Sequence, residues 1–102
     1  MWAQMIKVRV KPGRDDEIAG LFEHLRAAEQ PGSGLLRTMG MHDQKDPSQL
    51  YILVVFESEE KARAREQDPR RQEGLKPVQA LMADLLEGPP EFVDLIVDEH
   101  IA

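Results

Sequence analysis

The spacing of hydrophobic residues along the chain alternates between the period of a strand and the period of a helix. Residues 2–11 place Ile6, Val8 and Val10 on one face and mostly polar residues on the other, as in a strand that buries one side. From Asp15 the hydrophobic residues recur every three or four positions, which predicts an amphipathic helix. Its apolar stripe consists of Ile18, Leu21, Phe22, Leu25 and Ala28.

Capping and turn residues divide the next part of the chain into further elements. The Asp15-Asp16 pair can cap the exposed N–H groups of the first helix, and the Pro-Gly-Ser-Gly segment 31–34 ends it. Residues 35–42 and 49–57 both have strand character, and six polar residues separate them. We therefore expect these two segments to form a β-hairpin.

The last third of the chain predicts two helices and a strand. Ser58 is a good N-cap for a short helix that runs to about Gln67, and Asp68-Pro69 is expected to close it. A longer helix then has its regular part from near Lys76, and a strand covers residues 92–98. The order β-α-β-β-α-α-β predicts an α+β, ferredoxin-like fold with a four-stranded antiparallel sheet, formed by one domain over residues 1–102.

The third strand, residues 49–57, differs from the first because both of its faces are apolar. One face carries Leu50, Ile52, Val54 and Phe56, and the other carries Tyr51, Leu53 and Val55. The helices can cover only one face of such a sheet, and no segment is left over for the other. Since apolar patches of this size are uncommon on monomers, we predict a homodimer that joins two sheets into a dimeric α+β barrel. The alternative is a monomer whose central strand is unusually apolar.

Composition changes this picture little but excludes several functions. With 41% hydrophobic and 31% charged residues, the chain is typical of a globular protein. The longest apolar run, residues 50–56, is too short to cross a bilayer, so we expect a cytoplasmic protein with no membrane partner. Because the chain has no cysteine, it can form neither a disulfide nor a thiolate site.

The charge distribution argues against a nucleic-acid partner. The net charge of −6 opposes binding to phosphate backbones, which are themselves negative. Four arginines do cluster after the third strand: Arg63, Arg65, Arg70 and Arg71. Acidic residues are interleaved with them, and this pattern favours a solvated helix face over a nucleic-acid site.

Several short motifs occur in an order that is typical of one family. They are Val-Lys-Pro-Gly at 10–13, Pro31-Gly32 before the second strand, Asp46-Pro47 in the hairpin loop and Phe-Glu-Ser-Glu-Glu at 56–60. Together they resemble the antibiotic biosynthesis monooxygenase family over nearly the whole chain. The resemblance implies a dimeric α+β barrel with a ligand between the helices and the sheet of each protomer. Members include cofactor-independent oxygenases of aromatic polyketides and haem-degrading monooxygenases.

The residues that the haem-degrading branch requires are missing. That branch relies on an Asn, a Trp and a haem-ligating His, and the corresponding positions here are Ile6, Arg65 and Leu75. Many other relatives carry an aromatic residue at the end of the third strand and a His in the short helix, which correspond to Phe56 and Arg65. A guanidinium stays protonated near neutral pH and cannot act as a base. The resemblance therefore implies substrate contacts at Phe56 and Arg65, and no haem-degrading activity.

Few other polar residues could carry out chemistry on a bound ligand. A histidine is the natural base at neutral pH, so His42 and His24 are candidate catalytic residues, together with the Tyr51 hydroxyl. Thr38, within the second strand, is a candidate substrate contact. Each also has a purely structural interpretation. His24 would then be a surface residue of the first helix, His42 a residue that interacts locally with Asp43 at the start of the loop, and Tyr51 and Thr38 ordinary strand residues.

Two functions of different classes follow from these observations. The first is a small monooxygenase that acts on an aromatic or quinol-like molecule without a metal or other cofactor. The alternative is a non-catalytic dimeric module that binds a small apolar metabolite. We expect no metal site, because no two histidines have the short spacing that would let them converge locally on an ion.

Overall fold

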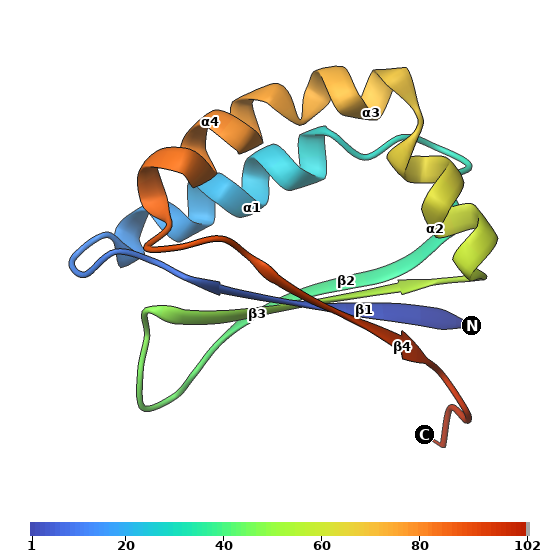
Figure 1. Cartoon of the computed structure of the whole chain (residues 1–102), viewed down its shortest axis with the longest axis horizontal. Coiled ribbons are helices and arrows are strands. Elements are labelled where there is room, and N and C mark those ends of the chain that lie inside the picture. Colours follow the sequence, from blue (N-terminus) through green and yellow to red (C-terminus); the bar gives the residue numbers. More distant parts are fainter. Residues whose placement is uncertain (102) are drawn as a thin grey trace.

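The computed structural model describes residues 1–101 and shows the α+β, ferredoxin-like fold that the sequence predicts (Figure 1). The elements in chain order are β1 (Trp2–Arg9), the 3₁₀ turn η1 (Asp15–Glu17), α1 (Ile18–Ala27), β2 (Leu35–His42), β3 (Gln49–Phe56), α2 (Glu59–Glu66), α3 (Pro69–Gly74), α4 (Lys76–Leu85) and β4 (Glu91–Ile96). None of the helices in residues 1–101 is long and apolar enough to span a bilayer.

The four strands form one antiparallel sheet in the order β2-β3-β1-β4. The register places Ile6 of β1 between Ile52 of β3 and Phe92 of β4. Since side chains alternate along a strand, these three residues lie on the same face of the sheet. The β2–β3 hairpin has the expected bounds and a loop over residues 43–48, with a register irregularity near Leu35.

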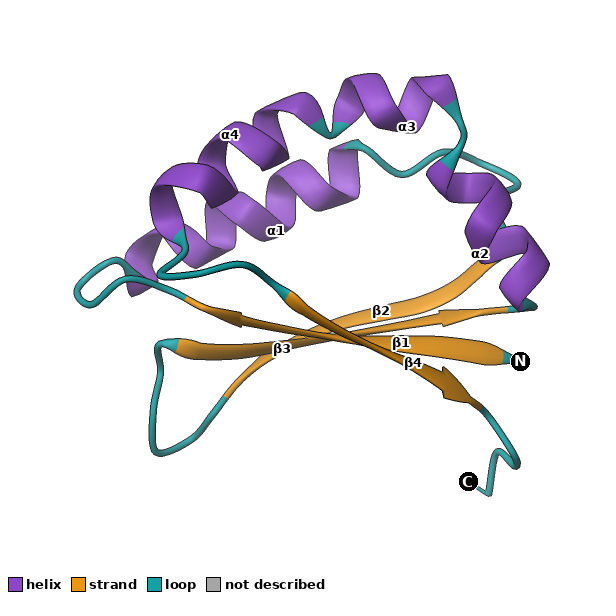
Figure 2. Cartoon of the chain, viewed as in Figure 1, coloured by secondary structure: helices purple, strands orange, loops and turns teal. Residues whose placement is uncertain are grey.

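The core lies between this face and the helices. Figure 2 shows α1 and α4 side by side above the sheet, with α2 at the end where β3 finishes. One cluster of buried residues consists of Val8, Val10, Leu21, Leu50, Val78, Leu85 and Leu86, and a second consists of Trp2, Ile52, Val54, Phe56 and Ala62. Full burial of a large apolar side chain stabilises a fold by about 1.5–3 kcal/mol, so these clusters hold the helices on the sheet.

The opposite face of the sheet, called the open face below, is not covered by the helices (Figure 1). Tyr51, Leu53 and Val55 of β3 lie there half-buried, and Met39 and Met41 of β2 are each 39% exposed. The expected pattern of β3 is therefore confirmed, because its other face is buried at every position from Leu50 to Phe56.

The helical part of the chain differs from the expectation in two places. The order β-α-β-β-α-α-β omits α3, because the Asp68 carboxylate accepts a hydrogen bond from Arg70 N (2.9 Å) and so caps a new helix with Pro69 in its first turn. The expectation that Asp15 and Asp16 cap the first helix is also wrong. These residues lie within the 3₁₀ turn, which has Arg14 at its N-cap and no capping side chain.

The remaining boundaries shift by one or two residues. β1 ends at Arg9, although Val10 continues into an isolated bridge with Leu86, and β4 ends at Ile96. The expected N-cap is confirmed, since Ser58 Oγ accepts a hydrogen bond from Lys61 N at 3.2 Å. α4 begins at Lys76 as expected.

Candidate functional site

A cavity of about 1040 Å³ lies between the helices and the inner face of the sheet. Its sheet side includes Ile6, Ile52, Val54 and Phe56, and β2 contributes Thr38 and Gly40. Its helix side includes Leu21 and Leu25 of α1 and Val78 and Met82 of α4. Ligand pockets are typically concave, mostly apolar and several hundred Å³ or more in volume, so this cavity is the candidate functional site.

A smaller hollow of about 450 Å³ lies at the end of α4. It is lined by Gln79, Met82, Ala83, Leu86, Gly88, Pro89 and Pro90. No ionisable side chain is among them, so this hollow offers no group that could bind an ionic ligand through charge or move a proton. The larger cavity combines apolar walls with ionisable groups.

An aromatic corner forms where β1 and β3 meet α2. The rings of Trp2 and Phe56 lie 6.0 Å apart at an angle of 46°. The guanidinium of Arg65 lies over the Phe56 ring at 5.1 Å, and that of Arg63 lies over the Trp2 ring at 5.0 Å. Such cation–π contacts favour a charged group against an aromatic face, so this end of the cavity combines aromatic surface with positive charge.

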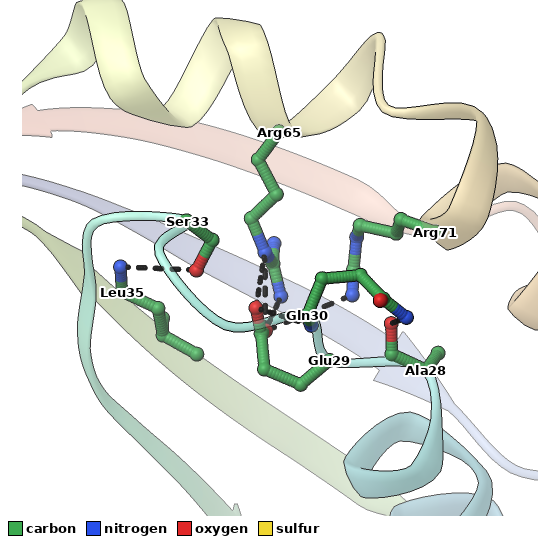
Figure 3. A network of polar contacts seen from close by, with 7 residues as sticks. All are labelled: Ala28, Glu29, Gln30, Ser33, Leu35, Arg65 and Arg71. Atoms are coloured by element: carbon green, nitrogen blue, oxygen red, sulfur yellow. Dashed lines mark hydrogen bonds and ion pairs between the residues drawn. The ribbon is translucent and has the colours of Figure 1, made fainter.

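The polar end of the cavity is built by three residues from different elements (Figure 3). Glu29 follows α1, Arg65 lies in the last turn of α2, and Arg71 lies in the last turn of α3. The Arg65 side chain donates to Glu29 Oε2 from Nη2 at 2.6 Å and from Nε at 3.2 Å. Arg71 Nη1 lies 3.8 Å from the same carboxylate oxygen, which makes an ion pair but not a hydrogen bond.

Burial and charge act in opposite directions on Glu29, which together with the two arginines is called the Glu29–Arg65–Arg71 trio below. Burial alone would raise the pKa of Glu29, but hydrogen bonds from Arg65 and Ser33 and the charges of both arginines lower it below its usual value. Burial lowers the pKa of Arg71, and the charge of Arg65 lowers it further, while Glu29 raises it. Because a guanidinium starts from a very high pKa, Arg71 remains charged.

One buried atom of this trio lacks a hydrogen-bond partner. Arg71 Nη1 is buried and makes no hydrogen bond within the described part of the chain. The side chains of Arg71 and Arg65 are only 12% and 14% exposed. Buried polar groups in native proteins are nearly always hydrogen-bonded, so an unpartnered charged donor at a cavity wall is an unusual feature.

The expected substrate contacts all lie at this cavity. Thr38 lines it from β2, Phe56 from the end of β3 and Arg65 from α2, although they are far apart in the sequence. The expected catalytic residues do not line it: His24 is exposed on α1, His42 is exposed at the end of β2, and Tyr51 lies on the open face. The structure therefore brings together Thr38, Phe56 and Arg65, and the catalytic role of the other three stays a prediction.

Two residues of the site, Glu29 and Arg71, were not predicted from the sequence. The interleaved charges after β3 favour a solvated face, yet Arg65 and Arg71 are mostly buried while Arg70 is 64% exposed. The signal that could have indicated a separate element for Arg71 is Asp68-Pro69, since these residues cap and start a new helix, which contains Arg71, as well as closing the previous one. Within residues 1–101, no group of three or more His, Asp or Glu side chains is placed to hold a metal ion.

Comparisons with known proteins agree with this architecture. A search of curated proteins finds no match. A protein of Nitrosomonas europaea that carries the name antibiotic biosynthesis monooxygenase has 15% identity, a TM-score of 0.74, and coverage of 97% of this chain and 100% of that chain. A variant of SnoaB, a cofactor-independent oxygenase from Streptomyces nogalater, has 15% identity, a TM-score of 0.75, and coverage of 98% and 95%. A second protein named antibiotic biosynthesis monooxygenase, from Chloroflexus aurantiacus, has 21% identity, a TM-score of 0.65, and coverage of 99% of this chain and 98% of that chain.

At these identities the solved structures support the fold alone, and the family rests on a separate match. The sequence model described as antibiotic biosynthesis monooxygenase matches residues 1–76, which include β1, the β2–β3 hairpin and the Arg65 and Arg71 positions. This match covers more than half of the chain and agrees with the motifs and the fold. The chain therefore belongs to the antibiotic biosynthesis monooxygenase family, within the dimeric α+β barrel superfamily.

Proposed function

We propose that this protein is a cofactor-independent monooxygenase that acts on an aromatic or quinol-like small molecule in the cavity between helices and sheet. The observation that carries the proposal is the cavity itself, which has about 1040 Å³ of space, mostly apolar walls and a charged end. Family membership supports monooxygenase chemistry, and the similarity to SnoaB supports a reaction without an added cofactor.

The proposed reaction draws its electrons from the substrate. For an anthrone-type compound, a ring CH₂ group loses a proton to give an electron-rich anion, which transfers electrons to O₂. One oxygen atom then becomes the new C=O group, and the other leaves as water with the two hydrogens of the CH₂ group. The protein has to bind the flat substrate, exclude water and stabilise the anion, which are the tasks that a preorganised cavity with fixed charges performs.

Three residues are proposed to hold the substrate. Phe56 offers an aromatic face within the buried corner, and Thr38 offers a hydroxyl from β2. Arg65 covers Phe56 and is fixed by Glu29, so it contributes charge in one orientation. His42, His24 and Tyr51 remain candidate bases; alanine variants of the histidines and a phenylalanine variant of Tyr51 test them by loss of activity with an unchanged fold.

We also propose that the protein works as a homodimer. The apolar side chains of the open face support this proposal, with Leu53 and Val55 half-buried and Met39, Met41 and Leu95 each 38–39% exposed. An apolar surface with contributions from β2, β3 and β4 is uncommon on a monomer. A second copy of the same face is the simplest cover, because a two-fold axis pairs identical patches.

A specific observation favours the alternative function, a non-catalytic module that binds a small apolar metabolite. Arg65 occupies the position where the resemblance implies a His, and its guanidinium, which Glu29 holds in place, stays protonated and cannot act as a base. A cavity of this kind can bind an aromatic molecule without a general base in it.

Oxygen uptake separates the two functions. Purified protein is mixed with anthrone or a hydroquinone, and oxygen consumption is followed together with formation of the oxidised product. Thr38→Trp, which fills part of the cavity from β2, should abolish uptake, whereas Gln44→Trp in the hairpin loop should retain it. Binding of anthrone without uptake would favour the module, and a panel of such compounds that shows neither uptake nor binding would refute both functions.

A further inference from the structure

We infer that the polar end of the cavity recognises one anionic oxygen group on an aromatic ligand, with Arg71 Nη1 as its principal donor. This inference rests on the proposed function to the extent that the cavity is the ligand site. It goes further in naming the class of ligand: a flat apolar body that carries a single negative charge at one end.

The charges around the cavity differ in sign from those of the whole chain. The chain carries a net charge of −6, yet the cavity lining contains four arginines and two glutamates. These residues are Arg26, Arg37, Arg65, Arg71, Glu29 and Glu66. A cavity that concentrates positive charge on an acidic protein favours an anion over a neutral or cationic ligand of the same shape.

Within the Glu29–Arg65–Arg71 trio one carboxylate serves two guanidinium groups. Glu29 is taken up by Arg65 through hydrogen bonds of 2.6 and 3.2 Å, and Arg71 reaches the same carboxylate only at 3.8 Å. The trio therefore keeps one positive charge that no side-chain oxygen balances at hydrogen-bond distance. Its unpartnered atom, Arg71 Nη1, is buried at the cavity wall.

The geometry suits a carboxylate or an ionised hydroxyl. A guanidinium presents its N–H donors in a planar fork, and charge-assisted hydrogen bonds to an oxygen anion are stronger than neutral ones. The walls beyond the trio are apolar, with Leu25, Leu75 and Val78 among the lining residues. A ligand that matches both parts is an aromatic acid, or a phenol or enol held as its anion.

Two matched pairs of ligands test the inference by fluorescence or absorbance titration. Anthracene-2-carboxylate is compared with anthracene-2-carboxamide, which has nearly the same shape without the charge. The second pair is 2,4-dinitro-1-naphthol, which is ionised at neutral pH, and its neutral methyl ether. We expect the wild-type protein to bind at least one anion roughly ten- to a hundredfold more tightly than its neutral partner.

Arg71→Gln should remove this preference while leaving the binding of the neutral ligands within about twofold. Arg70→Gln is the matched control, because Arg70 is adjacent in the sequence, pairs with Asp68 and is 64% exposed. It removes the same charge from the protein and should retain the preference, which excludes a general effect of net charge. Circular dichroism of both variants, and the retained binding of neutral ligands, show that the fold is intact.

Each outcome decides a different point. If only the carboxylate is preferred over its neutral partner, the ligand class is an aromatic acid. If only the naphtholate is preferred, the ligand class is an ionised hydroxyl. If both anions are preferred, the site accepts any oxygen anion. Equal binding of anion and neutral ligand, or a preference that survives Arg71→Gln, overturns the inference and leaves the oxygenase proposal standing. An Arg71-dependent preference without oxygen uptake leaves the inference standing and counts against the oxygenase. If none of the four ligands binds, the inference fails, and the oxygenase proposal is decided by the oxygen-uptake assay alone.

Discussion

Replacing Glu29 with glutamine tests the electrostatic balance of the site most directly. Glu29→Gln removes the carboxylate that Arg65 and Arg71 share and leaves two guanidinium groups close together at 12–14% exposure. Breaking a fully buried ion pair costs about 3–5 kcal/mol, whereas an exposed pair contributes about 0–1 kcal/mol. Because Glu29 itself is 26% exposed, we expect an intermediate loss of about 2 kcal/mol in the free energy of unfolding.

The pH dependence of this loss has a definite sign. The pKa of Glu29 is lowered in the folded protein, despite burial, by its hydrogen bonds and by the two arginines. A lowered folded-state pKa means that the contribution is fully present above the unfolded pKa and is lost as the pH falls through the folded value. The difference between wild type and Glu29→Gln should therefore be largest near pH 7 and should shrink as the pH falls below about 4.5, the ordinary value for the group.

Urea unfolding at equal protein concentration measures this difference, since association makes apparent stability depend on concentration. Glu23→Gln is the control: Glu23 lies on α1 and pairs with Arg26, but both side chains are about 70% exposed, so its loss should cost less than about 0.5 kcal/mol. Glu29→Gln should also strengthen anthracene-2-carboxylate binding, since the trio loses its negative charge and keeps both positive ones. Equal stability of the two variants at pH 7, with unchanged carboxylate binding, would refute the balance described here.

Two further predictions concern the open face and the packing of β2. Leu53→Lys, at the centre of the open face, should convert the proposed dimer into a monomer at micromolar concentration, as measured by light scattering. Lys45→Glu in the hairpin loop should leave the dimer intact, and a wild-type protein that is already monomeric would contradict the proposed dimer. Gly40→Ala should lower the free energy of unfolding by about 1–3 kcal/mol and alter ligand affinity, because an added Cβ would clash with the Phe22 ring. Gly20→Ala is the control and should not destabilise the protein, because there is open space around Gly20. Similar unfolding midpoints for both variants would show that the Phe22 ring moves freely.

The sequence predicts the strands of this protein better than its helices for a physical reason. The β2–β3 hairpin is marked twice, by alternating side chains within each strand and by the polar residues between them, and both marks place the loop at residues 43–48. The two-faced apolar pattern of β3 likewise reflects its central place in the sheet. Asp68-Pro69, by contrast, both ends one helix and begins the next, so the same two residues support either element order.

The site was harder to predict because it depends on which face of each element turns inward. Alternating charges after β3 are typical of a solvated helix, and Arg70 fulfils that expectation while the neighbouring Arg71 points into the cavity. His42 shows the opposite case: the register places it on the inner face of the sheet, opposite Leu50, but at the end of β2 it is exposed and does not line the cavity. Side-chain period fixes the face of a strand, but the extent of the cavity along that strand depends on where the helices pack.

Arg65 stands where the family resemblance implies a helix-borne histidine, and this difference changes the chemistry that the cavity can perform. A histidine would accept a proton from the substrate, whereas a guanidinium cannot, and Glu29 is a weak base because its pKa is lowered. The same positive charges stabilise the deprotonated form of a bound phenol or enol and so lower its pKa. An oxygenase built in this way would depend on the acidity of its substrate more than on a base of its own. That dependence joins the two proposals, since the arginine that recognises an anion would also favour formation of the anion that reduces oxygen.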